Sequence, residues 1–68
     1  MYNEFVRMYC EHFNLDVKHT NQTSWIYEDD RKIGHFNINE KIISFDNGVT
    51  VRKGDLVLSI LEGTNLHS

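Results

Sequence analysis

One cysteine and four histidines are the residues of this 68-residue chain that could bind a metal or serve as a nucleophile and its base. They are Cys10, His12, His19, His35 and His67. Structural zinc sites use closely spaced pairs of such ligands. The histidines form no such pair, and Cys10 and His12 would project to different sides of a helix. The sequence therefore predicts neither a metal site nor a cofactor.

The same residues give no indication of catalysis. A catalytic cysteine needs a base beside it in space, and no motif brings a histidine to Cys10. The four glycines are dispersed at positions 34, 48, 54 and 63, unlike a glycine-rich phosphate-binding loop. A domain of this length also has little room for a concave pocket. We expect a protein that is not an enzyme.

Composition and charge narrow the class of protein. An apolar content of 40%, with one Trp, three Tyr and four Phe, is typical of a folded domain rather than of a disordered chain. Seven basic and ten acidic residues give a net charge of −3, which disfavours a protein that mainly binds a phosphate backbone. The charged N-terminal segment and the lack of a long apolar stretch predict neither export nor membrane insertion. We therefore expect a cytoplasmic protein.

Apolar spacing predicts a helix over residues 2–13. Its apolar stripe comprises Tyr2, Phe5, Val6, Tyr9 and Phe13. Asn14 would end this helix in the left-handed conformation. The polar residues 17–24 indicate a loop.

Two apolar segments around the sequence EDDR (28–31) then predict a β-hairpin. Trp25 and Tyr27 share one face of its first strand, because side chains alternate along a strand. Gly34 in the second strand indicates a bulge or a close approach of two backbones.

The second hairpin is predicted to turn through three residues, 46–48, with Gly48 in the left-handed conformation. This register is preferred because it places four apolar side chains on one face. It puts Phe45 opposite Val49 and Ile43 opposite Val51.

Residues 56–62 allow two interpretations, a helix or a fully buried strand. As a helix, the segment would have Asp55 as its N-cap and Gly63 just past its end, and Val57, Ile60 and Leu61 would line one side. The expected fold is α+β with two layers. An N-terminal helix packs on a small antiparallel β-meander of three or four strands, followed by a short C-terminal helix, in a single domain over residues 1–68.

The meander would gather opposite charges at its two ends, because alternate turns lie at the same end of a sheet. One end would hold Glu28, Asp29, Asp30 and Asp46, and the other Lys41, Arg52 and Lys53. These charges either form binding surfaces or serve only to keep the domain soluble.

Two hypotheses of function follow. The first is a non-enzymatic module that binds another protein through Trp25, Tyr27 and the four acidic residues, alone or as a homodimer. Such a module would be a small accessory, inhibitory or regulatory protein of a bacterium, a phage or another mobile element. The second is a small regulatory protein that binds nucleic acid through Lys41, Arg52 and Lys53. Loss of binding after changes at the acidic and aromatic residues, or at the basic residues, would distinguish the two.

Overall fold

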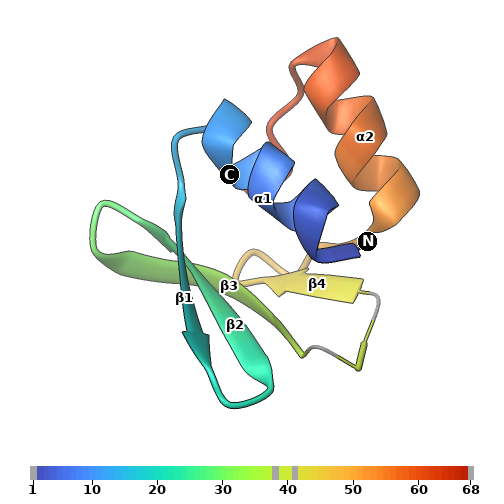
Figure 1. The fold of residues 1–68 in the computed structure, drawn as a ribbon. Coiled ribbons are helices and arrows are strands. Elements are labelled where there is room, and N and C mark those ends of the chain that lie inside the picture. The colour runs from blue at the N-terminus through green and yellow to red at the C-terminus, as the bar shows by residue number, and fades with distance from the viewer. Residues whose placement is uncertain (1, 38, 41, 68) are drawn as a thin grey trace.

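The computed structural model describes residues 2–37, 39–40 and 42–67. These residues form two helices and five strands, in the order α1 (Tyr2–His12), β1 (Asp16–Thr20), β2 (Thr23–Glu28), β3 (Arg31–Asn37), β4 (Ile42–Phe45), β5 (Thr50–Arg52) and α2 (Lys53–Glu62). The strands form one antiparallel sheet in sequence order. Both helices lie on the same side of this sheet (Figure 1). The predicted two-layer α+β fold is confirmed.

The prediction of a loop over residues 17–24 is wrong, because the chain there forms an additional strand, β1. It pairs with β2 through a tight turn in which Asn21 has a φ of 48°. Four of its five side chains are exposed, and Val17 is half-buried. A strand that buries so little has no apolar alternation in its sequence, which is why the pattern indicated a loop. The sheet consequently has five strands instead of three or four.

The first predicted hairpin is confirmed as β2 and β3. Asp29 and Asp30 form its turn with φ values of 51° and 68°, which the mirror-image turns of tight hairpins require. Beyond the turn, Tyr27 pairs with Lys32 but Ile26 pairs with Gly34, so Ile33 is the extra residue of a β-bulge. Because of the bulge, Ile33 points into the core and Lys32 points to the side of the sheet that faces away from the helices.

The second hairpin has the three-residue turn that the apolar pattern predicts. Ile43 pairs with Val51, and the Phe45 amide donates to the Val49 carbonyl at 2.9 Å. The Gly48 amide donates to the Phe45 carbonyl at 3.0 Å, and Gly48 has a φ of 89°. This register buries Ile43, Phe45 and Val51 against the helices, whereas Val49, the fourth residue of the predicted apolar set, is 39% exposed.

Residues 56–62 belong to a helix, but α2 begins at Lys53, before the predicted N-cap. Asp55 therefore lies inside the first turn, where its carboxylate accepts a hydrogen bond from the Arg52 amide at 3.1 Å. Gly63 ends the helix in the left-handed conformation, as predicted. The buried side is lined by Leu56 and Ser59, whereas Leu61 is 78% exposed. The predicted packing role of Leu61 is wrong, because Leu61 follows the buried Leu56 by five residues and therefore lies about 140° away from it around the helix.

The core lies between the helices and the sheet. On α1, Val6 and Tyr9 are buried and Phe5 and Phe13 are half-buried, which confirms the predicted stripe; the side chain of Tyr2 lies outside the described part. The other buried apolar side chains are Cys10, Leu15, Ile26, Ile33, Phe36, Ile43, Phe45, Val51 and Leu56. Asn14 ends α1 with a φ of 58°, as predicted.

Neither helix of the described residues has the length and apolar character needed to cross a membrane.

Replacing Gly34 with alanine tests how closely β3 and β4 approach. A Cβ atom at this position would lie 2.7 Å from Cδ1 of the buried Phe45 ring. We expect Gly34→Ala to lower the free energy of unfolding by about 1–3 kcal/mol, as other overpacked cores do. Urea unfolding followed by circular dichroism measures the change.

Gly54→Ala is the matched control, because a Cβ atom there would meet nothing within 4 Å and the residue lies in α2. It should leave stability unchanged or raise it by about 0.5–1 kcal/mol. Equal stabilities of the two variants would refute the close approach at Gly34.

Candidate functional site

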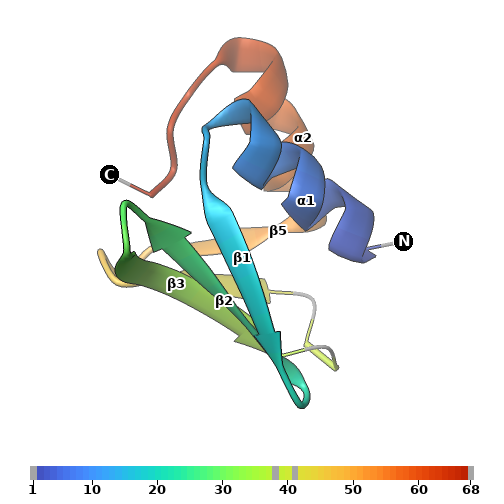
Figure 2. The ribbon, with the colours of Figure 1, turned by 60° about the vertical axis from the view of Figure 1, so that its left-hand side comes forward.

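The described residues leave one side of the sheet open, since both helices pack on the other side (Figures 1 and 2). On β2, Ile26 points into the core, so its neighbours Trp25 and Tyr27 point to the opposite side, where both are half-buried. We call this surface the open face. By the strand register it consists of Asp16, Lys18, Thr20, Thr23, Trp25, Tyr27, Lys32, His35, Asn37, Ile42, Ser44, Thr50 and Arg52.

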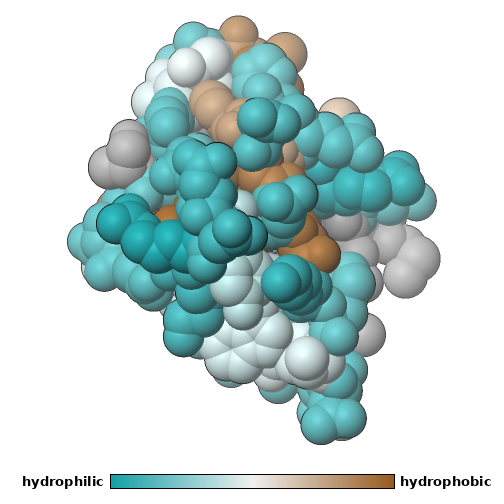
Figure 3. Space-filling model, turned by 90° about the vertical axis from the view of Figure 1, so that its left-hand side faces the viewer, coloured by the Kyte–Doolittle hydropathy of each residue, from teal (hydrophilic) through white to brown (hydrophobic). Residues whose placement is uncertain are grey.

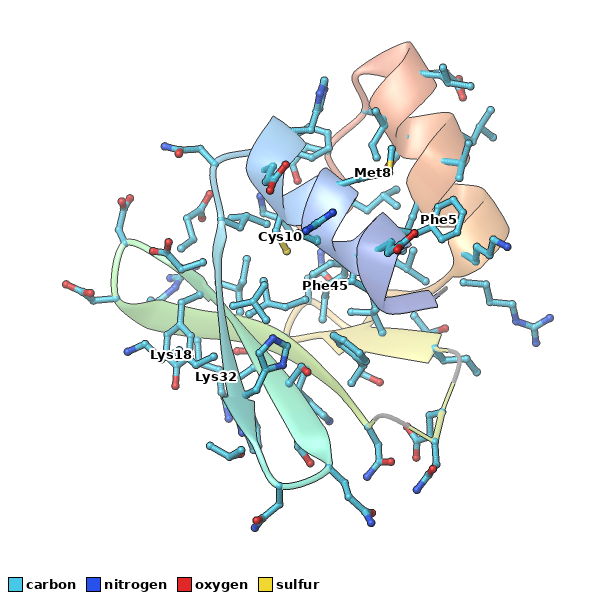
Figure 4. The ribbon with its side chains drawn as sticks, in the orientation of Figure 1. Phe5, Met8, Cys10, Lys18, Lys32 and Phe45 are labelled. Atoms are coloured by element: carbon cyan, nitrogen blue, oxygen red, sulfur yellow. The ribbon has the colours of Figure 1, made fainter. Side chains whose placement is uncertain are left out.

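Lysine side chains lie over both aromatic rings of the open face. Lys32 Nζ is 4.8 Å from the centroid of the Trp25 ring, and Lys18 Nζ is 4.8 Å from that of Tyr27. Figure 4 shows both lysines on the strands, away from the helix side chains Phe5 and Met8. A cation above an aromatic ring contributes about 0.5–1 kcal/mol at an exposed site. The pairs therefore help to fix the rings.

Two further contacts hold the indole of Trp25. Its Nε1–H donates to the Thr20 hydroxyl at 2.7 Å, and its ring centroid lies 5.4 Å from that of His35. The indole is therefore contacted by side chains from β1 and β3, which restrict its orientation.

The open face is more positive than the protein as a whole. Lys18, Lys32 and Arg52 lie on it, and Asp16 is its acidic residue. The whole chain, in contrast, has a net charge of −3. The predicted protein-binding set therefore divides into two parts, because its aromatic members lie among lysines and its acidic members lie at one end of the sheet.

That acidic end contains Asp29, Asp30 and Asp46, all exposed. The two turns that carry them are neighbours, because the Asp46 amide donates to the Ile33 carbonyl at 2.8 Å. Glu28, the fourth residue of the predicted acidic end, is less exposed than these three. It is half-buried, and its Oε2 lies 3.5 Å from Nε2 of His67.

His67 was not predicted to have a partner, yet it fixes the C-terminal tail. The tail runs from α2 down to the β2–β3 turn (Figure 2), and the His67 side chain is buried there. Its Nδ1 lies 2.8 Å from the Tyr9 hydroxyl, which also accepts the Leu66 amide at 3.0 Å. The Tyr9 hydroxyl and Nδ1 of His67 thus share one hydrogen bond, and Nε2 of the same ring faces Glu28. No sequence signal could reveal a contact between residues so far apart along the chain.

The residues of the predicted basic end occupy different surfaces. Arg52 lies on the open face, whereas Lys53 Nζ lies 4.5 Å above the Phe5 ring in the helix layer. Lys41 lies outside the described residues. The structure therefore does not bring Arg52 and Lys53 together.

Cys10 points from α1 towards the sheet and is 2% exposed (Figure 4). Burial raises the pKa of its thiol to about 12, with smaller contributions from the charges of Asp16 and Glu11. His12, His19 and His35 are exposed on three different elements. Within the described ranges, no three His, Cys, Asp or Glu side chains are grouped as a metal site would require.

Comparisons of the chain with protein-family models, with curated proteins and with solved structures find no match.

The environment of Cys10 predicts a pH dependence of stability. Between the ordinary thiol pKa of 9.0 and the folded-state value of about 12, the unfolded chain loses a proton that the folded chain keeps. The free energy of unfolding should therefore fall as the pH rises above about 9. Below that pH the thiol is protonated in both states and should not make stability depend on pH. Urea unfolding of the wild type and of Cys10→Ala between pH 7 and 11 measures this effect.

The decline should be steeper in the wild type than in the alanine variant, which still contains Tyr9, whose pKa is also raised by burial. Parallel pH profiles of the two proteins would contradict the assigned environment of the thiol.

Proposed function

We propose that this protein is a non-enzymatic module that binds another protein through the open face. The observation that carries the proposal is the placement of Trp25 and Tyr27 on the side of the sheet without helices, each beneath a lysine. Trp and Tyr provide large contact areas with few rotatable bonds, and they are enriched among the residues that dominate binding energy. Because these rings are already held by their neighbours, their ordering costs little on binding.

The charges of the open face specify the chemistry of the partner. Lys18 and Lys32 flank the aromatic centre, so a complementary surface would have an apolar patch bordered by carboxylates. The exposed Asp29 and Asp30 at one end of the same sheet would repel those carboxylates. This asymmetry would favour one orientation of the partner.

Nucleic acid is the second candidate, because lysines beside aromatic rings also suit stacked bases and phosphates. Three observations favour a protein instead. The net charge is −3, and acidic turns border the open face. The lysine ammonium groups also lie over the ring faces that a base would need for stacking. By analogy of size alone, the proposal extends to a small cytoplasmic accessory or regulatory protein of a bacterium or a mobile element.

Capture of proteins from nuclease-treated extract of the source cell by the immobilised chain tests the proposal. We expect one protein to be retained by the wild type and reduced at least tenfold by Trp25→Ala, as for other central aromatic residues of interfaces. Lys32→Glu should also weaken retention, more strongly at low salt than at high salt. Quantitative mass spectrometry of the eluates provides the measurement.

Two control variants make comparable changes in α2, on the other side of the sheet from the open face. Lys53→Glu makes the same charge change, and Leu61→Ala removes an exposed apolar side chain. Both should retain the protein as the wild type does, and circular dichroism confirms that each variant is folded. Equal retention by all variants would refute the open face as the site. Retention of nucleic acid alone, in untreated extract, would favour the second candidate.

A further inference from the structure

A second surface lies along the free edge of β1; it shares Asp16 and Lys18 with the open face, but the inference drawn from it does not rest on the proposed function. In the described part of the chain, β1 pairs with β2 on one side and forms an edge of the sheet on the other. An edge strand presents backbone N–H and C=O groups that can pair with another strand. The opposite edge, β5, has three residues and continues directly into α2. β1 is therefore the edge that is long enough to accept a strand.

An apolar groove accompanies this edge between β1 and α1. Val6, Val17 and Phe36 line it together with Glu4, Arg7 and His19, and its volume is about 230 Å³. Figure 3 views this side of the molecule and shows apolar atoms in its middle, framed by hydrophilic ones. A strand added to β1 would cover Val17 and extend the apolar layer beneath the helices.

The charges along β1 are complementary to those of a second β1. When two antiparallel strands pair, residues that stand opposite each other lie on the same face of the sheet. If Val17 stands opposite Val17 of a second copy, Asp16 of each copy stands opposite Lys18 of the other. Opposite charges in such pairs are favourable, whereas the register centred on Lys18 would oppose two lysines.

We propose that this protein forms a two-fold symmetric dimer by antiparallel pairing of β1 with β1 of a second copy, with Val17 at the symmetry axis. The pairing joins the two sheets into one continuous sheet and satisfies the edge groups of both strands. Because the two-fold axis is perpendicular to the sheet, the open faces of both copies lie on the same side. The two Trp25 rings then belong to one extended surface.

A charge exchange between Asp16 and Lys18 tests the register. Asp16→Lys or Lys18→Asp alone places like charges opposite each other at two positions of the dimer. Each should raise the dissociation constant about tenfold or more, from the loss of two favourable pairs and the gain of two unfavourable ones. The double variant Asp16→Lys/Lys18→Asp restores both pairs and should return the constant to near its wild-type value. Sedimentation equilibrium at low salt measures these constants.

Glu62→Lys is the matched control for Asp16→Lys, because it makes the same charge change at an exposed residue of α2. It should dimerise as the wild type does. Circular dichroism confirms that the single variants are folded, and hydrogen exchange of the β1 amides should slow as the protein concentration rises.

A wild-type protein that stays monomeric up to about 1 mM, far above the micromolar range of specific dimers, would overturn the proposal. So would a dimer that is equally stable in the wild type, both single variants and the double variant, because its contact would then lie elsewhere.

Discussion

The whole structure depends on the packing of both helices against one face of a small sheet. Tyr9, Ile26, Phe36 and Leu56 meet in that single layer, and each buried side chain of this size contributes about 1.5–3 kcal/mol relative to an exposed one. A chain of 68 residues has no further element among its described residues to cover the other face. The aromatic side chains there are consequently held by neighbours on their own face, which are Lys18 for Tyr27 and Lys32, Thr20 and His35 for Trp25.

Local chemistry explains how much of the fold could be predicted. Gly48 determined the turn of one hairpin and Gly63 the end of α2, because each adopts a left-handed conformation that few residues tolerate. β1 could not be predicted, because an exposed edge strand buries too little to show a pattern. The attachment of His67 to Tyr9 depends on tertiary folding, and neither residue indicates the other.

The candidate site was predictable in part for the same reasons. Alternation along β2 placed Trp25 and Tyr27 on one face, but their lysine partners depend on two features that the pattern did not show. Lys18 reaches the open face because β1 exists, and Lys32 reaches it because the bulge at Ile33 shifts the register of β3. The open face is thus a consequence of a core built on one side, the free edge of β1 is a consequence of an open sheet, and a two-fold dimer would join the open faces of two copies.

The most direct test of the open face as a binding surface is site-specific photo-crosslinking in the source cell. A photoreactive phenylalanine analogue would replace His35, which is exposed beside Trp25, or Leu61, which is exposed on α2. Our account predicts that the analogue at position 35 crosslinks one discrete protein and that the analogue at position 61 does not. Crosslinking from position 61 alone would show that the protein acts through its helices, and it would contradict the account.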